Sequence, residues 1–133
     1  MTNFLIDLKN KKFAQGEPLE PEAIIVAQKV LHNMGMDFIP PSYTNFLKHY
    51  NGIKYDGSYL FGATVDDDLD IIDKNAEMQK PENTILLGYN DFDLLCYNYR
   101  LKKYQIIDRN DFEVLESYTE DERDFALSNI MAF

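Results

Sequence analysis

The sequence contains no tryptophan, a single cysteine and only six glycines in 133 residues. Cys96 cannot form an internal disulfide, and no second cysteine stands near it to complete a metal site. The glycines stand apart, and none begins the G-x-x-x-x-G-K pattern of a phosphate-binding loop. The longest apolar runs, such as Ile24–Ala27 and Ile85–Leu87, are far too short to cross a bilayer. No basic stretch followed by an apolar segment opens the chain, so we expect no signal peptide, no membrane association and a cytoplasmic location.

Positive charge is also scarce, because 13 basic side chains stand against 23 acidic ones and the net charge is −10. Residues 64–133 hold seven basic and seventeen acidic side chains, which accounts for the whole excess. A nucleic-acid partner needs Lys and Arg to neutralise its phosphates, so we expect no nucleic-acid binding. A basic protein partner would be attracted instead, although acidity also keeps proteins soluble without any partner.

Length and element order predict one domain over residues 1–133. Helix-forming patterns come first, then one strand, a further helix, a group of strands and a closing helix. Clustered strands favour an α+β fold with a mainly antiparallel sheet of about five strands, flanked by N-terminal helices and a C-terminal helix. We expect these strands at Tyr59–Gly62, Thr84–Gly88, Phe92–Tyr97, Tyr104–Ile107 and Phe112–Tyr118.

Apolar spacing and end signals place the helices. A short amphipathic helix is expected at Phe4–Leu8, and a longer one from Pro21 to about Met34, where Gly35 ends it. The later helices should bury one stripe each: Tyr43, Phe46, Leu47 and Tyr50; then Leu69, Ile72 and Ala76; then Phe125, Leu127, Ile130 and Met131. Thr119 and Glu122 have the spacing of a capping box for the last helix.

The sequence offers little catalytic chemistry. His32 and His49 lie in no recognisable metal motif. Cys96 alternates with Phe92 and Leu94 along an expected strand, which favours a buried thiol over a nucleophile. We therefore predict a protein that is not an enzyme, with no cofactor and no bound metal.

Two groups of carboxylates stand out, Asp66, Asp67, Asp68, Asp70 and Asp73 in the first and Glu113, Glu116, Glu120, Asp121, Glu122 and Asp124 in the second. The first group could bind a hard cation, but its spacing does not fit a calcium-binding loop. We interpret it as a solvated face in which Asp68 caps a helix.

An ordered set of short motifs resembles the signature of the SUKH superfamily, which contains a yeast cell-wall assembly regulator and many bacterial immunity proteins. Proline-rich Ile39–Tyr43 comes first, then Phe46-Leu47 and Asn51-Gly52, then Leu60-Phe61-Gly62 and the Leu86–Gly88 strand. The resemblance covers about residues 20–133. Its motif positions are structural ones: Pro40, Tyr43, Phe46, Leu47, Asn51, Gly52, Phe61 and Gly62.

The resemblance implies a protein that binds another protein, and bacterial members commonly look like immunity partners of secreted toxins, often nucleases. A nuclease presents a basic surface, so an acidic inhibitor suits it. We expect the contact residues to be Asp66, Asp67, Asp68, Asp70, Asp73, Tyr89, Tyr99, Glu113, Glu116, Tyr118, Glu120 and Asp121. The alternatives are a regulatory or scaffold adaptor domain and, beyond these, an enzyme or small-ligand binder with a pocket among the aromatic residues.

Overall fold

The computed structural model describes residues 14–15, 18–36, 38–63 and 70–132. They form four α-helices and one antiparallel sheet, so the predicted α+β class is confirmed. Within these residues, no helix is both long enough and apolar enough to cross a membrane. The helix expected at Phe4–Leu8 lies outside the described residues.

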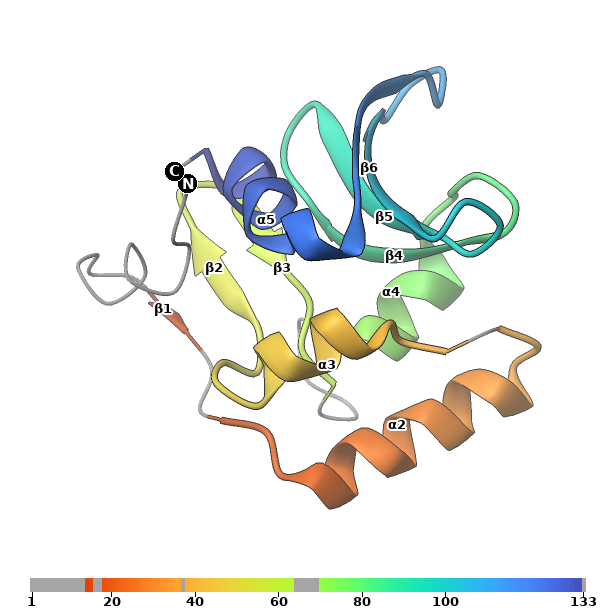
Figure 1. The fold of residues 1–133 in the computed structure, drawn as a ribbon, viewed down its shortest axis with the longest axis vertical. Coiled ribbons are helices and arrows are strands. Elements are labelled where there is room, and N and C mark those ends of the chain that lie inside the picture. The colour runs from red at the N-terminus through yellow and green to blue at the C-terminus, as the bar shows by residue number, and fades with distance from the viewer. Residues whose placement is uncertain (1–13, 16–17, 37, 64–69, 133) are drawn as a thin grey trace.

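The sheet is an antiparallel meander in which each strand pairs with the next one in the chain (Figure 1). Six strands of three residues or more follow a two-residue first strand, so the expected number of about five was slightly low. Short turns join β2 to β3 and each strand from β4 to β7 to the next, whereas α2 and α3 lie between β1 and β2, and α4 lies between β3 and β4. The strands are β1 (Ala14–Gln15), β2 (Ile53–Tyr55), β3 (Ser58–Leu60), β4 (Thr84–Tyr89), β5 (Asp93–Asn98), β6 (Lys103–Asp108) and β7 (Val114–Tyr118).

The β2–β3 hairpin contains a strand that was not predicted, β2, whereas β3 overlaps the strand expected at Tyr59–Gly62. Its two-residue turn is Asp56-Gly57, and both residues have positive φ, 49° and 81°. Asp-Gly is a strong signal for this turn, because a two-residue hairpin needs left-handed backbone at both positions. The signal was present, but Ile53–Tyr55 is too short to stand out by its own periodicity.

The helices α2 (Pro21–Asn33) and α3 (Pro41–Leu47) begin with proline, whose missing N–H costs nothing in a first turn. Gly35 has φ of +80° just past the end of α2, as predicted. Helix α2 buries Ile24, Ala27 and Leu31. Met34, where the helix was expected to end, lies just past its last residue and is 41% exposed.

Helix α4 (Ile71–Glu77) differs from prediction in its cap and in its buried face. The side chain of Asp70 caps it by accepting from the Ile72 N–H at 2.9 Å, whereas Asp68 was expected to be the cap. Asn75 is buried and Ala76 is exposed, the reverse of a simple apolar stripe. Leu69, expected on the same stripe, lies outside the described residues.

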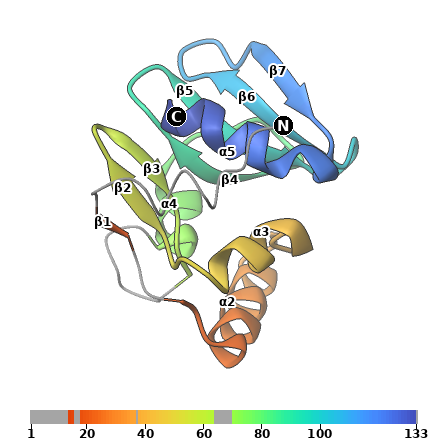
Figure 2. The ribbon, with the colours of Figure 1, turned by 60° about the vertical axis from the view of Figure 1, so that its left-hand side comes forward.

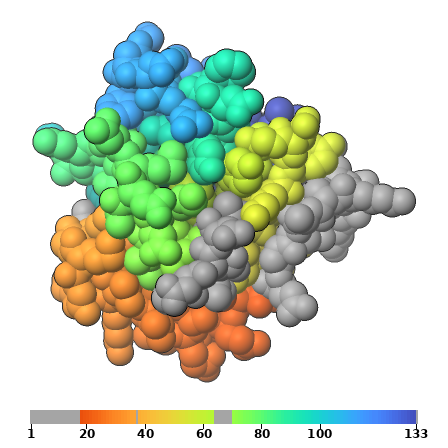
Figure 3. All heavy atoms as spheres, turned by 180° about the vertical axis from the view of Figure 1, so that it is seen from behind, coloured from red at the N-terminus to blue at the C-terminus, as the bar shows by residue number. Residues whose placement is uncertain are grey.

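Asn75 completes the edge of β4 where β3 does not reach. Its side-chain amide donates to the Leu86 carbonyl at 2.8 Å and accepts from the Leu86 N–H, also at 2.8 Å. β3 pairs with β4 only near Gly88 and Tyr89, so these backbone groups would otherwise be buried without partners. Seen from behind, α4 (green) lies between α2 and the hairpins of the sheet (Figure 3).

The chain closes with a 3₁₀ turn, η1 (Glu120–Glu122), and helix α5 (Arg123–Met131). The predicted capping box is present, with the Thr119 N–H donating to Glu122 Oε1 at 2.9 Å. Helix α5 packs against β3, β5, β6 and β7 (Figure 2). Its Leu127 and Ile130 are fully buried. Phe125, expected to be buried with them, is 36% exposed.

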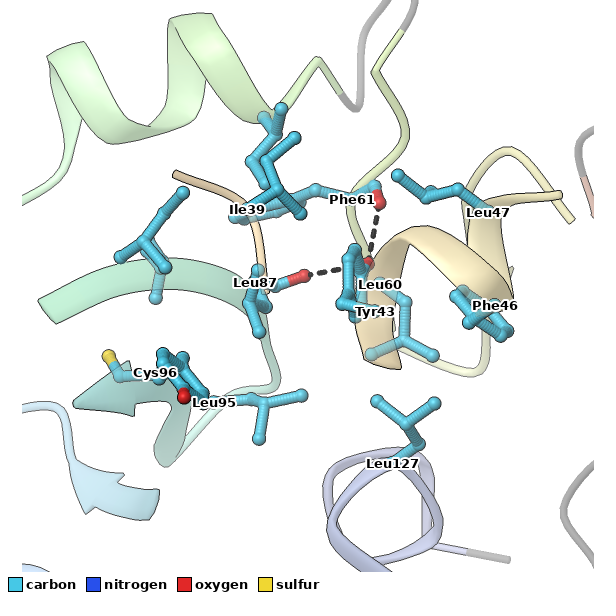
Figure 4. Close-up of a cluster of buried hydrophobic side chains, with 14 of the residues drawn as sticks. Ile39, Tyr43, Phe46, Leu47, Leu60, Phe61, Leu87, Leu95, Cys96 and Leu127 are labelled. Atoms are coloured by element: carbon cyan, nitrogen blue, oxygen red, sulfur yellow. Dashed lines mark hydrogen bonds between the residues drawn. The ribbon is translucent and has the colours of Figure 1, made fainter. Parts of the chain in front are cut away.

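The residues that carry the family resemblance meet in one compact junction. Tyr43 donates its hydroxyl to the carbonyl of Phe61 at 2.6 Å and lies 3.3 Å from that of Leu87 (Figure 4). A Cβ on Gly62 would lie 2.5 Å from Asn51 Oδ1, which accepts from the Ala63 N–H at 2.8 Å. Only glycine permits this approach, so these motif positions build the core.

Candidate protein-binding surface

The outer strand β7 forms, with η1, the surface that we call the acidic edge: Glu113, Val114, Leu115, Glu116, Glu120 and Asp121. Among the described strands β7 pairs with β6 alone, and it lies at the rim of the sheet (Figure 2). All six residues are exposed, Val114 by 47% and Leu115 by 45%. The register shifts between Ile106 and Ile107, which makes Leu115 an extra residue in the ladder. Apolar and acidic side chains therefore share one open strand.

Arg109 and Arg123, the arginines nearest to the acidic edge in sequence, both make hydrogen bonds within the chain. Arg109 donates to the Asn90 carbonyl at 2.8 Å, and its guanidinium lies 5.1 Å from the centre of the Tyr89 ring. Arg123 donates to Asp124 Oδ1 at 2.7 Å and to the Ser42 carbonyl at 2.8 Å. The contacts of both guanidinium groups therefore lie outside the acidic edge.

One carboxylate of the acidic edge is held in place. Tyr97 donates its hydroxyl to Glu120 Oε1 at 2.6 Å. Burial of Tyr97, together with this carboxylate, raises the pKa of the phenol, so it stays a donor at neutral pH. Glu120 is thereby oriented on the surface before any partner arrives.

The three tyrosines predicted as contact residues, Tyr89, Tyr99 and Tyr118, do not form one surface. Tyr118 lies on β7, half-buried, and accepts from Asn129 at 3.1 Å. Tyr89 stacks on Tyr59 with ring centres 4.8 Å apart. Tyr99 donates to the Phe38 carbonyl at 2.6 Å. Tyr118 alone therefore accompanies the acidic edge.

The first carboxylate group does not join the acidic edge either. Asp70 is completely buried as the cap of α4, so the prediction that it contacts a partner is wrong. Asp73 is exposed, but α4 packs on β4, and strands β5 and β6 separate β4 from β7. Asp66, Asp67 and Asp68 lie outside the described residues.

Sequence reasoning missed the exposed apolar residues. Phe92 was placed in a strand but lies in the β4–β5 turn and is 77% exposed. Val114 and Leu115 stand side by side between two glutamates, which was the available signal, because a strand with one buried face would alternate. Helix α2 also exposes Ile25 and Val26, but Glu22 and Lys29 beside them give that face no single sign of charge.

The groups that would support catalysis are dispersed. Cys96 is fully buried, and burial raises the pKa of its thiol to about 12. His32 and His49 are both exposed on separate elements. Among the described residues, no three His, Cys, Asp or Glu side chains gather closely enough to hold a metal ion.

One hollow lies between the end of α2 and the start of β4. Its volume is about 170 Å³, and it is lined by Gly35, Met36, Lys80, Asn83, Thr84 and Tyr99. Pockets for small ligands usually measure roughly 300–1,000 Å³ and have more apolar walls. The hollow therefore gives less support to a ligand-binding function than the acidic edge gives to a protein-binding one.

Comparison of the chain with models of known protein families gives no match, and comparison with curated proteins gives none either.

Proposed function

We propose that the chain is a non-enzymatic protein-binding domain of the SUKH type that neutralises a basic, nuclease-type toxin through the acidic edge. The observation that carries this proposal is the composition of β7 and η1. Exposed Val114 and Leu115 are bordered by Glu113, Glu116, Glu120 and Asp121, while the neighbouring arginines are engaged elsewhere. Apolar contacts inside a polar rim are the usual anatomy of a specific interface.

The charge of this surface suits a toxin that binds nucleic acid. Such a toxin must place Lys and Arg where its phosphates bind, so an inhibitor with the opposite field is steered toward that site. The motif junction around Tyr43 and Phe61 supports the proposed family, because its residues do the structural work that the resemblance implies. A regulatory adaptor is the second candidate, and the mixed apolar and acidic strand would serve it equally well.

The test is protection of cells by co-expression. The probe is a basic nuclease-type toxin domain encoded beside the gene for this chain. The variant converts four carboxylates of the acidic edge, through Glu113→Gln, Glu116→Gln, Glu120→Gln and Asp121→Asn. A matched control removes the same charge from exposed sites elsewhere, through Glu20→Gln, Glu22→Gln, Glu77→Gln and Glu82→Gln.

The wild-type chain and the control should protect cells, and the acidic-edge variant should not. Glu120→Gln keeps an oxygen that can accept from Tyr97, so the variant should fold. Equal protection by the variant and the control would contradict the proposal. A gene without any toxin beside it would favour the adaptor.

A further inference from the structure

The open side of β7 points to a mode of binding. We infer that an extended, basic segment of the partner adds to β7 as a further strand of the sheet, an inference that rests on the proposed function. Strand addition takes its affinity from main-chain hydrogen bonds and its specificity from alternate side chains. On β7, these two contributions come from the outward backbone groups of Ser117 and from the exposed side chains.

The backbone of Ser117 turns away from β6. The Asp108 N–H donates to the Glu113 carbonyl at 2.9 Å, so the even-numbered residues of β6 direct their backbone groups toward β7. Their partners, Glu116 and Tyr118, must direct theirs back toward β6. Ser117 stands between these two and is exposed, so its N–H and carbonyl point outward.

The side chains select the kind of segment. Glu113 and Glu116 favour Lys or Arg on an incoming strand, and exposed Val114 and Leu115 favour apolar residues between the basic ones. The strand contains neither lysine nor proline, two of the residues that usually protect an open edge. Its bulge at Leu115 bends the edge but leaves Glu116 to Tyr118 in regular register.

A second copy of the chain fits this edge poorly. Glu116 is the central residue of β7, so a symmetric antiparallel pair centred on the strand would set Glu116 opposite its own copy. Like charges directly opposite each other destabilise a strand pair. The negative charge of the edge therefore disfavours a second copy and favours a strand of the opposite charge.

The experiment uses three end-capped nine-residue peptides and the ¹⁵N-labelled full chain. The first peptide alternates lysine with valine, the second replaces lysine with glutamate, and the third is the lysine peptide with alternate backbone nitrogens methylated. Binding is followed by amide shifts and by hydrogen exchange at β7. The lysine peptide should bind and slow exchange at Ser117, and the other two should not.

Two variants at one position test the same point from the protein side. Ser117→Pro removes an outward N–H, while Ser117→Ala keeps it, and both lose the 3.4 Å contact with Gln105. The lysine peptide should bind Ser117→Ala like the wild type and Ser117→Pro about tenfold more weakly. If Ser117→Pro does not fold, the methylated peptide still decides the question.

Strand addition is wrong if the methylated peptide binds as well as its parent, or if Ser117→Pro binds like Ser117→Ala. Protection of Ser117 by self-association, with no peptide present, would also overturn it. These failures are separable from failure of the proposed function. A toxin that needs the four carboxylates but ignores Ser117→Pro would keep the function and remove the strand pairing.

Discussion

The hydroxyl of Tyr43 in α3 donates to the carbonyl of Phe61 at 2.6 Å, across a distance of 18 residues in the chain. Tyr43 is completely buried, and burial raises the pKa of its phenol well above the usual value. The hydroxyl therefore remains protonated and can donate to the carbonyls of Phe61 and Leu87. Phe61 directly follows β3, and Leu87 lies within β4.

Tyr43→Phe should therefore lower the free energy of unfolding by about 1–3 kcal/mol, because a buried carbonyl loses its donor. Urea denaturation measures the change. Tyr118→Phe removes a hydroxyl whose bond to Asn129 is exposed, and it should alter stability by less than about 0.5 kcal/mol. Equal effects of the two changes would show that the buried bond has no special weight.

Asn75→Ala should lower the free energy of unfolding by about 3 kcal/mol, because it leaves the buried N–H and carbonyl of Leu86 without hydrogen-bond partners. Ala76→Ser, on the exposed side of the same helix, serves as the control and should cost less than about 0.5 kcal/mol. Hydrogen exchange at Leu86 adds a local measurement. A slow Leu86 amide in the Asn75→Ala variant would mean that another group protects the edge of β4.

The Cys96 thiol should be inert in the folded chain. It is buried, and its pKa of about 12 leaves almost no thiolate at pH 8. A thiol reagent such as Ellman's reagent should react only as fast as the chain unfolds, and at the rate of a free thiol once urea is added. Rapid reaction without denaturant would contradict the burial and reopen a nucleophilic role.

Asp93→Asn should stabilise the chain at neutral pH. Asp93 lies directly opposite Asp108 in the β5–β6 ladder, and partial burial together with this charge raises the pKa of Asp93. A raised pKa in the folded state means that ionised Asp93 opposes folding above that pKa. The gain should be about 0.5 kcal/mol at pH 7.

The same gain should shrink as the pH falls through the raised pKa of Asp93, and it should vanish below the ordinary value of 3.8. Urea denaturation between pH 7 and pH 3 follows it. Asp91→Asn, which removes the same charge from an exposed residue of the preceding turn, is the control. A gain that does not depend on pH would exclude repulsion from Asp108 as its cause.

The features that were predicted correctly from the sequence are those that depend on a few neighbouring residues, such as helix ends. Pro21, Gly35 and the Thr119–Glu122 box placed helix ends correctly, because each acts on its own backbone. The burial of Asn75 in place of Ala76 could not be predicted from the sequence. Asn75 supplies hydrogen bonds to a part of β4 that β3 does not reach, and this need arises only in the assembled sheet.

The candidate surface was predicted in part for the same reason. Glu113, Glu116, Glu120 and Asp121 are exposed together, as expected. Their position at the edge of the sheet depends on β7 being the last strand of the meander, and no local sequence pattern specifies the strand order. Asp70 was expected to be exposed with its acidic neighbours, but it is buried because its carboxylate caps α4.

The most direct test is the rate at which the chain associates with the basic toxin domain, measured at about 20 mM and 300 mM salt. The wild-type chain should bind at least about tenfold faster at low salt, because steering between opposite charges weakens with ionic strength. The four-carboxylate variant of the acidic edge should lose most of this acceleration, and the matched control should keep it. An on-rate that is the same in the variant and the control, at both salt concentrations, would contradict the assignment of the acidic edge as the contact surface.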